Sequence, residues 1–539
     1  MRLTRSAHID TFCRDHLPDQ ELWPELRFDL EELDYPERLN AAAELLDGTI
    51  ARLGADRPCL RSPEATWTYG EVQGKANRLA RLLVEDMGLV PGNRVLLRGP
   101  NNPWLVVAWL AVLKAGGVAV TTMALLRASE IAALAGITRP DLAVCDHRFL
   151  AELDEALPGL PVVGYGGTGE HDLDARCAGK DDAFSAVDTA GDDVAMLAPT
   201  SGTTGRPKAT MHFHRDILAI ADTFSKYVIK PEPDDVFTGS PPVGFTFGLG
   251  AVVVFPLRVG ASALLLERPA AAELADAIAE HGATVLSTAP TAYRAMLAMG
   301  KAKQLSGLRR CISAGEHLPA TVWQDFYDRT GIKIIDGIGS TEMLHVFIAS
   351  ADDAIRPGST GRPVPGYQAV ILDAQGRRMP DGMAGRLAVK GPTGCRYLSD
   401  TRQRTYVVDG WNITGDTYIR DADGYFWYQA RSDDMIISSG YNIAGPEVEQ
   451  ALLGHADVVE AAVVGVPDAE RGTVVGAYVV LRDGAFGDAV KAAELQEFAK
   501  KTIAPYKYPR RVEFLDELPK TNTGKIQRYL LRKRAAGES

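Results

Sequence analysis

Short apolar runs alternate with helical segments along the first two thirds of the chain, and few folds accommodate that order. The run 93–99 reads as a strand between a helix over 68–87, with Thr68 as its N-cap, and a helix over 102–116 that Gly116 ends. Buried strands that alternate with helices predict an α/β fold with a largely parallel sheet. Further strands are expected at 141–146, 160–165, 260–267, 283–290, 308–315 and 333–342.

The pattern changes after about residue 365. Residues 369–391 predict strand, turn, strand, and residues 417–431 predict a hairpin that turns at Asp423-Gly424. Residues 444–519 read as a compact α+β unit. A chain of 539 residues exceeds what one core usually supports, so we expect at least two domains, with the boundary near 429–436.

Composition and charge exclude several function classes. A formal net charge of −12 argues against a nucleic-acid partner that binds through bulk charge. The longest apolar stretches, 104–113 and 243–257, are shorter than the ~20 residues of a membrane span, and the N-terminus lacks a signal-peptide core. We therefore expect a soluble, cytoplasmic protein. We also expect reduced thiols, because the cysteines are widely spread and form no close metal-binding spacing; they are Cys13, Cys59, Cys145, Cys177, Cys311 and Cys395.

The stretch "TSGTTGRPK", residues 200–208, has the composition of a phosphate-binding loop. Backbone N–H groups of a Gly-rich turn can cradle an anion, hydroxyls add donors, and Lys208 adds a positive charge. The spacing is not that of a P-loop, because Arg206-Pro207 separates Gly205 from Lys208. An ordinary surface loop is the alternative. The candidate phosphate ligands are Thr200, Ser201, Gly202, Thr203, Thr204, Gly205 and Lys208.

The order of this loop closely resembles the signature of the adenylate-forming superfamily, which includes acyl-CoA synthetases, adenylation domains of peptide synthetases and luciferases. "DGIGSTE" at 336–342 resembles a second family motif, in which Thr341 would contact the nucleotide phosphate and Glu342 would help to hold Mg²⁺. "SAGEHLP" at 313–319 resembles the turn that lies against adenine. The nucleotide-binding residues that these two motifs imply are Gly315, Glu316, His317, Asp336 and Gly337.

Three further motifs follow in family order. In "WNITGD", Asp416 would accept hydrogen bonds from the ribose hydroxyls, and Arg431 would also reach the ribose, although Ala430 replaces the usual Gly before it. Asp433 matches the hinge, and Lys525 in "LPKTNTGKIQR" matches the catalytic lysine. The resemblance runs from about residue 65 to 532.

The resemblance implies a reaction in two halves. A carboxylate attacks the α-phosphate of ATP, giving an acyl-adenylate and pyrophosphate, and a thiol then displaces AMP. It also implies an α/β N-terminal AMP-binding domain (1–432) with a β-rich subdomain, and a small mobile α+β domain (433–539) that swings about the hinge. Gly440 and Tyr441 would line the tunnel for the CoA thiol, and Lys507 would meet CoA phosphates together with Arg510 and Arg511.

An aromatic acid is the expected substrate. Phe245 and Phe247 would face a flat ring, and His345 would hydrogen-bond a ring substituent. The alternatives are that the two Phe residues belong to a buried strand and that His345 is a satisfied core histidine. The other pocket residues are Ala314, Ile338 and Gly339.

These motifs together look like the benzoate and 2-aminobenzoate CoA ligases. We therefore predict an ATP-dependent aryl-CoA ligase that uses ATP, Mg²⁺ and CoA, has no nucleic-acid or membrane partner, and has a homodimer as one possible assembly. Two alternatives stay open: a stand-alone enzyme that loads a carrier-protein phosphopantetheine, and a catalytically silent nucleotide-binding protein.

Overall fold

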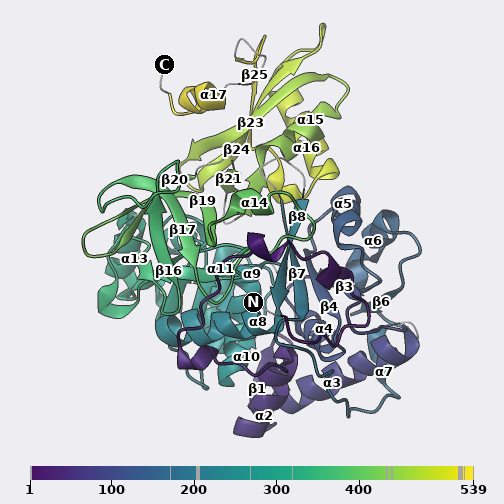
Figure 1. Ribbon diagram of the computed structural model, residues 1–539. Helices are drawn as coiled ribbons and strands as arrows, with labels where there is room; N and C mark the ends of the chain where they lie inside the picture. Colours follow the sequence, from purple (N-terminus) through teal and green to yellow (C-terminus); the bar gives the residue numbers. More distant parts are fainter. Residues whose placement is uncertain are drawn as a thin grey trace.

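The computed structural model describes residues 3–169, 172–201, 207–267, 269–318, 320–431, 435–438, 441–519, 526 and 528–537. Two lobes are visible in Figure 1: the described residues up to 431 form the large N-terminal lobe below, and those from 435 onward form the C-terminal lobe above it. Each lobe has its own buried apolar clusters. The fold class predicted from the alternation of strands and helices is confirmed.

The first sheet of the N-terminal lobe has the strand order β6-β5-β3-β4-β7-β8 and is parallel except for the β7–β8 pair. Its strands are β3 (Arg94–Gly99), β4 (Val118–Met123), β5 (Leu142–Asp146), β6 (Val162–Tyr165), β7 (Val194–Ser201) and β8 (Pro207–Phe213). The accompanying helices are α3 (Tyr69–Arg81), α4 (Pro103–Lys114), α5 (Ala128–Thr138), α6 (Leu150–Ala156) and α7 (Leu173–Cys177).

Local sequence signals fix the ends of these helices. The predicted N-cap is confirmed: the Thr68 side chain accepts a hydrogen bond from the Glu71 N–H at 3.2 Å, and the Glu71 carboxylate accepts one from the Thr68 N–H at 2.7 Å. The Asn102 side chain caps α4 by accepting a hydrogen bond from the Leu105 N–H at 3.0 Å, and Gly116 follows that helix with a φ of 73°.

The second sheet has the order β15-β14-β13-β12-β11-β9-β10-β1-β2, parallel from β13 to β1 with antiparallel edges. Its strands are β1 (Pro58–Arg61), β2 (Thr66–Thr68), β9 (Val236–Gly239), β10 (Ser262–Leu264), β11 (Val285–Thr288), β12 (Arg310–Ser313), β13 (Ile334–Gly339), β14 (Val346–Ala349) and β15 (Arg362–Pro363). The other helices of this lobe include α2 (Gly48–Leu53), α8 (His214–Ile220), α9 (Thr246–Leu249), α10 (Phe255–Val259), α11 (Ala271–His281), α12 (Pro290–Ala298) and α13 (Ala320–Thr330).

The third sheet is antiparallel and contains the predicted hairpin. The turn of that hairpin includes Gly424 at a φ of 83°, as the sequence predicts. Its elements are β16 (Gln368–Leu372), β17 (Ala384–Lys390), α14 (Gln403–Tyr406), β18 (Val407–Val408), β19 (Trp411–Arg420) and β20 (Phe426–Arg431).

The C-terminal lobe is a small α+β unit. Strands β23, β24 and β25 form one sheet and β21 pairs with β22, with helices packed against them. Its elements are β21 (Met435–Ser438), β22 (Tyr441–Ala444), α15 (Gly445–Leu453), β23 (Val458–Asp468), β24 (Gly472–Leu481), α16 (Ala489–Thr502), a short 3₁₀ turn (Pro505–Lys507), β25 (Arg511–Phe514) and α17 (Arg528–Ala535).

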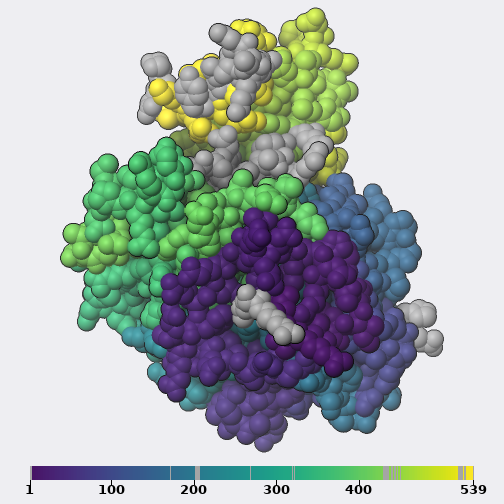
Figure 2. Space-filling model, viewed as in Figure 1, coloured from purple at the N-terminus to yellow at the C-terminus, as the bar shows by residue number. Residues whose placement is uncertain are grey.

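The N-terminal segment crosses the front of the large lobe, where Figure 2 shows it in purple. Ser6 donates a hydrogen bond to Asp193 at 2.5 Å, and Asp10 pairs with Arg94, so this segment is tied to the first sheet. None of the described helices combines the length and the apolar character that a membrane crossing requires. All six cysteines are buried free thiols.

Candidate active site

A cavity of about 1550 Å³ lies where the two lobes face each other, and walls from both lobes enclose it. Many of the residues singled out in the sequence line it. They are Thr200, Lys208, Phe245, Phe247, Ala314, Gly315, Gly339, Thr341, Glu342, His345, Asp416, Tyr441 and Lys507.

Other predicted residues lie elsewhere. Glu316, His317, Asp336, Gly337 and Ile338 are described but are not among the residues that line this cavity. Several predicted residues fall outside the described residues: Gly202, Thr203, Thr204, Gly205, Asp433, Gly440 and Lys525. The side chains of Ser201 and Arg431 are likewise outside the description.

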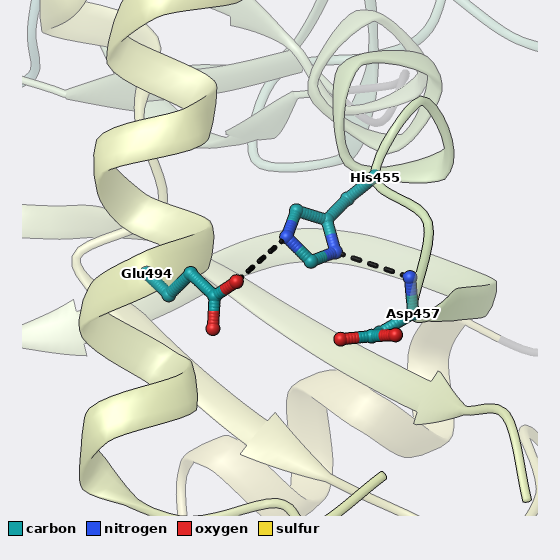
Figure 3. A group of neighbouring side chains, drawn as sticks. All are labelled: His455, Asp457 and Glu494. Carbon is teal, nitrogen blue, oxygen red and sulfur yellow. Dashed lines mark hydrogen bonds and ion pairs between the residues drawn. The ribbon is translucent and has the colours of Figure 1, made fainter.

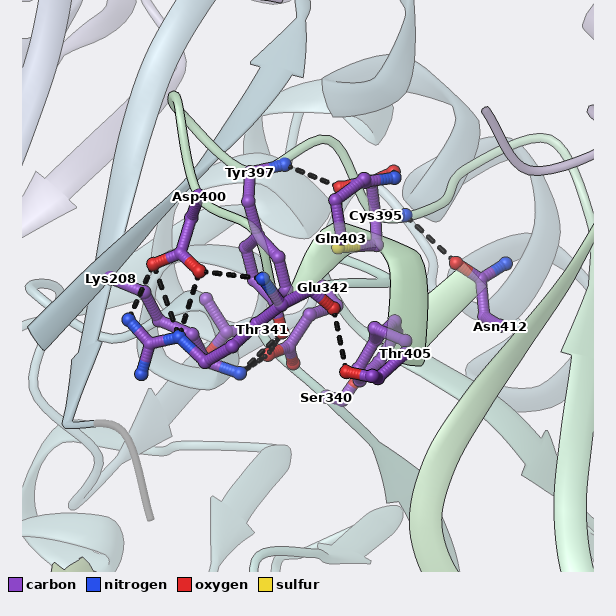
Figure 4. A network of polar contacts seen from close by, with 12 residues as sticks. Lys208, Ser340, Thr341, Glu342, Cys395, Tyr397, Asp400, Gln403, Thr405 and Asn412 are labelled. Atoms are coloured by element: carbon purple, nitrogen blue, oxygen red, sulfur yellow. Dashed lines mark hydrogen bonds and ion pairs between the residues drawn. The ribbon is translucent and has the colours of Figure 1, made fainter. Parts of the chain in front are cut away.

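Lys208 and Glu342 form an ion pair on the wall of the cavity. The Lys208 ammonium lies 2.9 Å from Oε1 of Glu342, and the Tyr397 hydroxyl donates a hydrogen bond to the same oxygen at 2.5 Å (Figure 4). Burial would raise the pKa of Glu342, but the charge of Lys208 and the hydrogen bond from Tyr397 outweigh burial and lower this pKa to about 2. Glu342 is therefore ionised at neutral pH.

The backbone brings Tyr397 to this pair although it is distant in sequence. Residues 396–398 run beside β8, because the Met211 N–H donates to the Arg396 carbonyl at 2.7 Å and the Leu398 N–H donates to the Ala209 carbonyl at 2.9 Å. The Tyr397 N–H also donates to Oε1 of Gln403 at 2.9 Å (Figure 4). The strand that carries Lys208 therefore also holds Tyr397.

Two buried contacts hold the segments that carry Tyr397 and Glu342. The Arg396 guanidinium pairs with Asp216, and both side chains are fully buried. Nε2 of His212 donates to the Thr341 carbonyl at 2.8 Å, which ties β8 to the turn that carries Glu342. Burial lowers the pKa of His212 to about 3, so this imidazole is neutral.

The nucleotide motifs meet beside the third sheet. The antiparallel register of β19 and β20 places Asp416 directly opposite Arg431, and Asp416 is almost fully buried on the cavity wall. The His317 ring stacks on Tyr428, with centroids 5.3 Å apart. Asp336 is buried outside this cavity; burial raises its pKa well above the usual range, and its Oδ1 has no hydrogen-bond partner among the described residues.

His345 lines the cavity and lies in an aromatic cluster. Its ring centroid is 4.6 Å from that of Phe255, 5.4 Å from Phe224 and 5.7 Å from Phe247. Nε2 contacts the Phe247 carbonyl at 3.3 Å, whereas Nδ1 is buried and has no hydrogen-bond partner among the described residues. Burial lowers the pKa of His345 to about 3. The His345 ring is therefore neutral, and only one of its two nitrogens has a hydrogen-bond partner among the described residues.

The segment that carries Phe245 and Phe247 is helical, so the alternative of a buried strand is wrong. Phe245 precedes α9, and the helical path continues to Val259. Close packing explains the glycines here, because a Cβ at Gly248 would lie 2.1 Å from the Pro242 carbonyl oxygen and one at Gly250 would lie 2.3 Å from the His345 ring. The helix packs too tightly for side chains at these positions.

A buried lysine joins the two lobes at the edge of the cavity. The Lys507 ammonium lies 2.6 Å from a carboxylate oxygen of Glu130 on α5 and 2.6 Å from one of Glu447 on α15. Lys507 is only 4% exposed. In this arrangement two carboxylates bind the charge of Lys507, and its contact with CoA phosphates stays a prediction. Beside it, the rings of Tyr441 and Tyr506 stack at 4.2 Å.

One surface cluster of described residues has the makeup of a metal site but is already neutralised. His455, Asp457 and Glu494 lie together on the C-terminal lobe, and Nε2 of His455 is 3.1 Å from Glu494 (Figure 3). The Lys491 ammonium binds Asp457 at 2.8 Å and Glu494 at 2.6 Å, and Arg482 also pairs with Asp457. Protein cations therefore balance these carboxylates.

With the geometry described, comparisons with known proteins identify the family. Residues 47–397 match the family described as AMP-binding enzyme, and residues 447–525 match the AMP-binding enzyme C-terminal domain. The chain belongs to the AMP-binding enzyme family. It is an AMP-forming acid–thiol ligase, and its cofactors and co-substrates are ATP, Mg²⁺ and CoA. The predicted recognition is confirmed.

The relatives of this chain include ligases of aromatic acids. It is 35% identical to a benzoate–CoA ligase of Thauera aromatica over 92% of this chain and 96% of that protein. It is 33% identical to a 4-hydroxybenzoate–CoA/benzoate–CoA ligase of Rhodopseudomonas palustris over 92% and 94% of the two chains. Among solved structures, the anthranilate CoA ligase AuaEII in complex with anthranoyl-AMP matches with a TM-score of 0.73 and 32% identity, over 94% of this chain and 99% of that one.

Sequence reasoning missed part of the ligase site. Tyr397, His212 and Gln403 belong to no motif used above, and Tyr397 meets Lys208 across 189 residues of sequence. The bridge from Lys507 to Glu130 spans 377 residues and was missed for the same reason. A cue existed for Tyr397, since "CRYL" is a short segment of buried residues between Gly394 and Asp400, but nothing in the sequence indicates its pairing with β8.

Proposed function

We propose that the protein is an ATP-dependent aryl-CoA ligase and that 2-aminobenzoate is its preferred acid. The observation that carries the proposal is the state of His345. A carbonyl oxygen only accepts hydrogen bonds, so the contact from Nε2 to the Phe247 carbonyl requires the single proton of the neutral ring to be on Nε2. Nδ1 is then a bare acceptor that no described residue satisfies.

A ring substituent that donates a hydrogen bond would satisfy Nδ1 of His345. The amino group of 2-aminobenzoate has such a donor, and benzoate has none. Leaving a buried polar atom unpaired costs free energy, so an acid with a donor gains relative to one without it. Of the aromatic rings near His345, that of Phe247 also lines the cavity, as does that of Phe245, and flat rings of this kind favour a flat substrate.

The names of several relatives support an aromatic carboxylic acid as the substrate, and the acids in those names differ in their ring substituents. Three of the curated relatives are described as ligases of benzoate, of 4-hydroxybenzoate and benzoate, and of 3-hydroxybenzoate. Anthranilate, on which AuaEII is described as acting, is 2-aminobenzoate. Another solved relative is a benzoate CoA ligase from Burkholderia xenovorans, with a TM-score of 0.69, 33% identity and coverage of 92% of this chain and 100% of that one.

The chemistry of activation then depends mainly on charge and positioning. The acid is ionised at neutral pH and needs no general base. Lys208 would place a positive charge on phosphate oxygens, and Asp416 would accept hydrogen bonds from the ribose. The Glu342 carboxylate fits a hard cation, because it is ionised and already faces an ammonium at 2.9 Å. Bound Mg²⁺ supplies charge that stabilises the pyrophosphate oxygens.

The remaining roles extend the proposal to the second half-reaction. In the first half-reaction, Lys525 would stabilise the carboxylate and α-phosphate oxygens. For the second, Asp433 would act as the hinge between domains 1–432 and 433–539. Tyr441 lies on the wall of the shared cavity beside Tyr506, which supports entry of the CoA thiol between the lobes.

Substrate competition tests the choice of acid. Values of kcat/KM are measured for 2-aminobenzoate and benzoate with the native enzyme and with His345→Leu, which removes both ring nitrogens. The native enzyme should prefer 2-aminobenzoate by about 10-fold, the value of one buried hydrogen bond of about 1.4 kcal/mol. His345→Leu should lose this preference by reacting more slowly with 2-aminobenzoate.

Phe255→Leu is the matched control, because it removes a neighbouring ring of the same cluster without touching a polar atom. It should lower kcat/KM for both acids by similar factors. Two results would refute the assignment of 2-aminobenzoate without refuting the ligase activity: equal kcat/KM values of the native enzyme for benzoate and 2-aminobenzoate, or a preference for 2-aminobenzoate that persists in His345→Leu.

A further inference from the structure

We infer that Tyr397 is a positioning residue for the metal-binding carboxylate of Glu342. This inference rests on the proposed role of Glu342 as the Mg²⁺ ligand. It concerns a residue that lies on the wall of the same cavity but far from the phosphate loop and the Thr-Glu motif in sequence.

The direction of each hydrogen bond follows from the chemistry of the three groups. An ammonium only donates and a carboxylate only accepts, so the Lys208 ammonium donates to the Tyr397 oxygen and the Tyr397 hydroxyl donates to Glu342. The Lys208 ammonium also contacts the same Glu342 oxygen, Oε1. The tyrosine hydroxyl is thus a neutral link between the two charges, and one carboxylate oxygen receives both contacts.

A hydroxyl that donates to a ligating carboxylate fixes the orientation of that carboxylate toward a cation. Tyr397 is well suited to this task because its side chain is fully buried and its backbone is held by β8 and by Gln403. Its ring also packs edge-on against Tyr406 at 5.7 Å. Whichever cation faces Glu342, the hydroxyl holds the carboxylate in place.

Metal affinity, measured without turnover, tests the inference. Mn²⁺ binding is followed by electron paramagnetic resonance in the presence of α,β-methylene-ATP, which cannot form the adenylate. Tyr397→Phe, which removes only the hydroxyl, should weaken Mn²⁺ binding roughly 10–100-fold. In the activity assay, the Mg²⁺ concentration for half-maximal rate should rise while saturating Mg²⁺ restores much of kcat.

Tyr367→Phe is the matched control, since Tyr367 is also buried and its hydroxyl contacts the Thr393 hydroxyl at 3.0 Å rather than the carboxylate of Glu342. The control should lose stability without any change in Mn²⁺ affinity. If Tyr397→Phe behaves like this control, Tyr397 only supports the fold and the inference is overturned.

Glu342→Gln separates this inference from the proposal beneath it. If Glu342→Gln leaves Mn²⁺ affinity unchanged, the proposed metal role of Glu342 fails. If Glu342→Gln weakens binding and Tyr397→Phe does not, only the inference about Tyr397 fails. In the double variant, the two losses should not add, because the hydroxyl acts through the carboxylate.

A second variant keeps the test valid if Tyr397→Phe does not fold. Incorporation of 4-fluorophenylalanine at position 397 fills most of the hydroxyl volume without restoring a donor. This protein should show the same weakened Mn²⁺ binding, and native affinity in it would overturn the inference.

Discussion

Replacing Lys507 by Met should separate the two lobes without unfolding either one. The lysine is buried between Glu130 of the N-terminal lobe and Glu447 of the C-terminal lobe, with both contacts at 2.6 Å. Methionine keeps most of the apolar stem and removes the ammonium. Two carboxylates, with exposed side-chain fractions of only 10% and 17%, then lack their shared cation.

The size of the effect follows from this burial. Removing one partner of a buried ion pair costs about 3–5 kcal/mol, because the remaining charge is uncompensated. The docked arrangement of the lobes should weaken by a factor of roughly 100 to 4,000, since every 1.4 kcal/mol is a factor of ten. Each lobe has its own apolar core, so separation relieves the buried charge at lower cost than unfolding.

Energy transfer between dyes on the two lobes measures the separation. The six native cysteines are buried, so dyes attach selectively to cysteines introduced at exposed Asp353 and Phe486. Lys507→Met should shift the population to low transfer efficiency. Adding Glu130→Gln should restore part of the high-efficiency population, because it removes a carboxylate that has lost its cation.

Lys491 provides the control, since it also binds two carboxylates, Asp457 and Glu494, but all three belong to the C-terminal lobe. Lys491→Met should leave the transfer efficiency unchanged. Native efficiency in Lys507→Met would refute the reasoning that the buried bridge holds the lobes together.

Two further predictions concern buried charges. Burial raises the pKa of Glu447 to about 7, Lys507 opposes this rise and the hydrogen bond with Glu130 adds to it. The folded protein therefore holds a proton that the unfolded chain loses above about pH 4.5, so this proton stabilises the fold fully at low pH and the stabilisation is lost as the pH rises through 7. The melting temperature should accordingly fall from pH 5 to pH 8. Glu447→Gln should make the melting temperature less dependent on pH. Arg396→Met should lower the unfolding free energy by about 3–5 kcal/mol by stranding Asp216, and native thermal stability in this variant would contradict that estimate.

Much of the fold was predictable because its signals are local. Thr68 and Gly116 mark helix ends through capping geometry, and the apolar run 93–99 becomes β3, flanked by helices. The hairpin at Gly424 follows from the glycine's freedom at positive φ. The Phe245–Phe247 segment was ambiguous, because alternating aromatic residues suit a strand and the glycines that allow tight helix packing have no distinct sequence signal.

The candidate site was predictable only where one motif carries several of its residues. Lys208 and Glu342 belong to two such motifs, and the structure brings them to 2.9 Å. Tyr397 joins them through strand pairing between distant segments, and Lys507 finds its carboxylates through the docking of two lobes. Long-range contacts of this kind depend on tertiary packing, so neither periodicity nor spacing reveals them.

The most direct test of the central claim is product analysis by mass spectrometry after incubation with ATP, Mg²⁺, CoA and 2-aminobenzoate. The proposed function predicts 2-aminobenzoyl-CoA, AMP and pyrophosphate in equal amounts, with the adenylate detectable when CoA is omitted. Formation of ADP, or parallel incubations that give thioesters from fatty acids but from no aromatic acid, would contradict an aryl-CoA ligase.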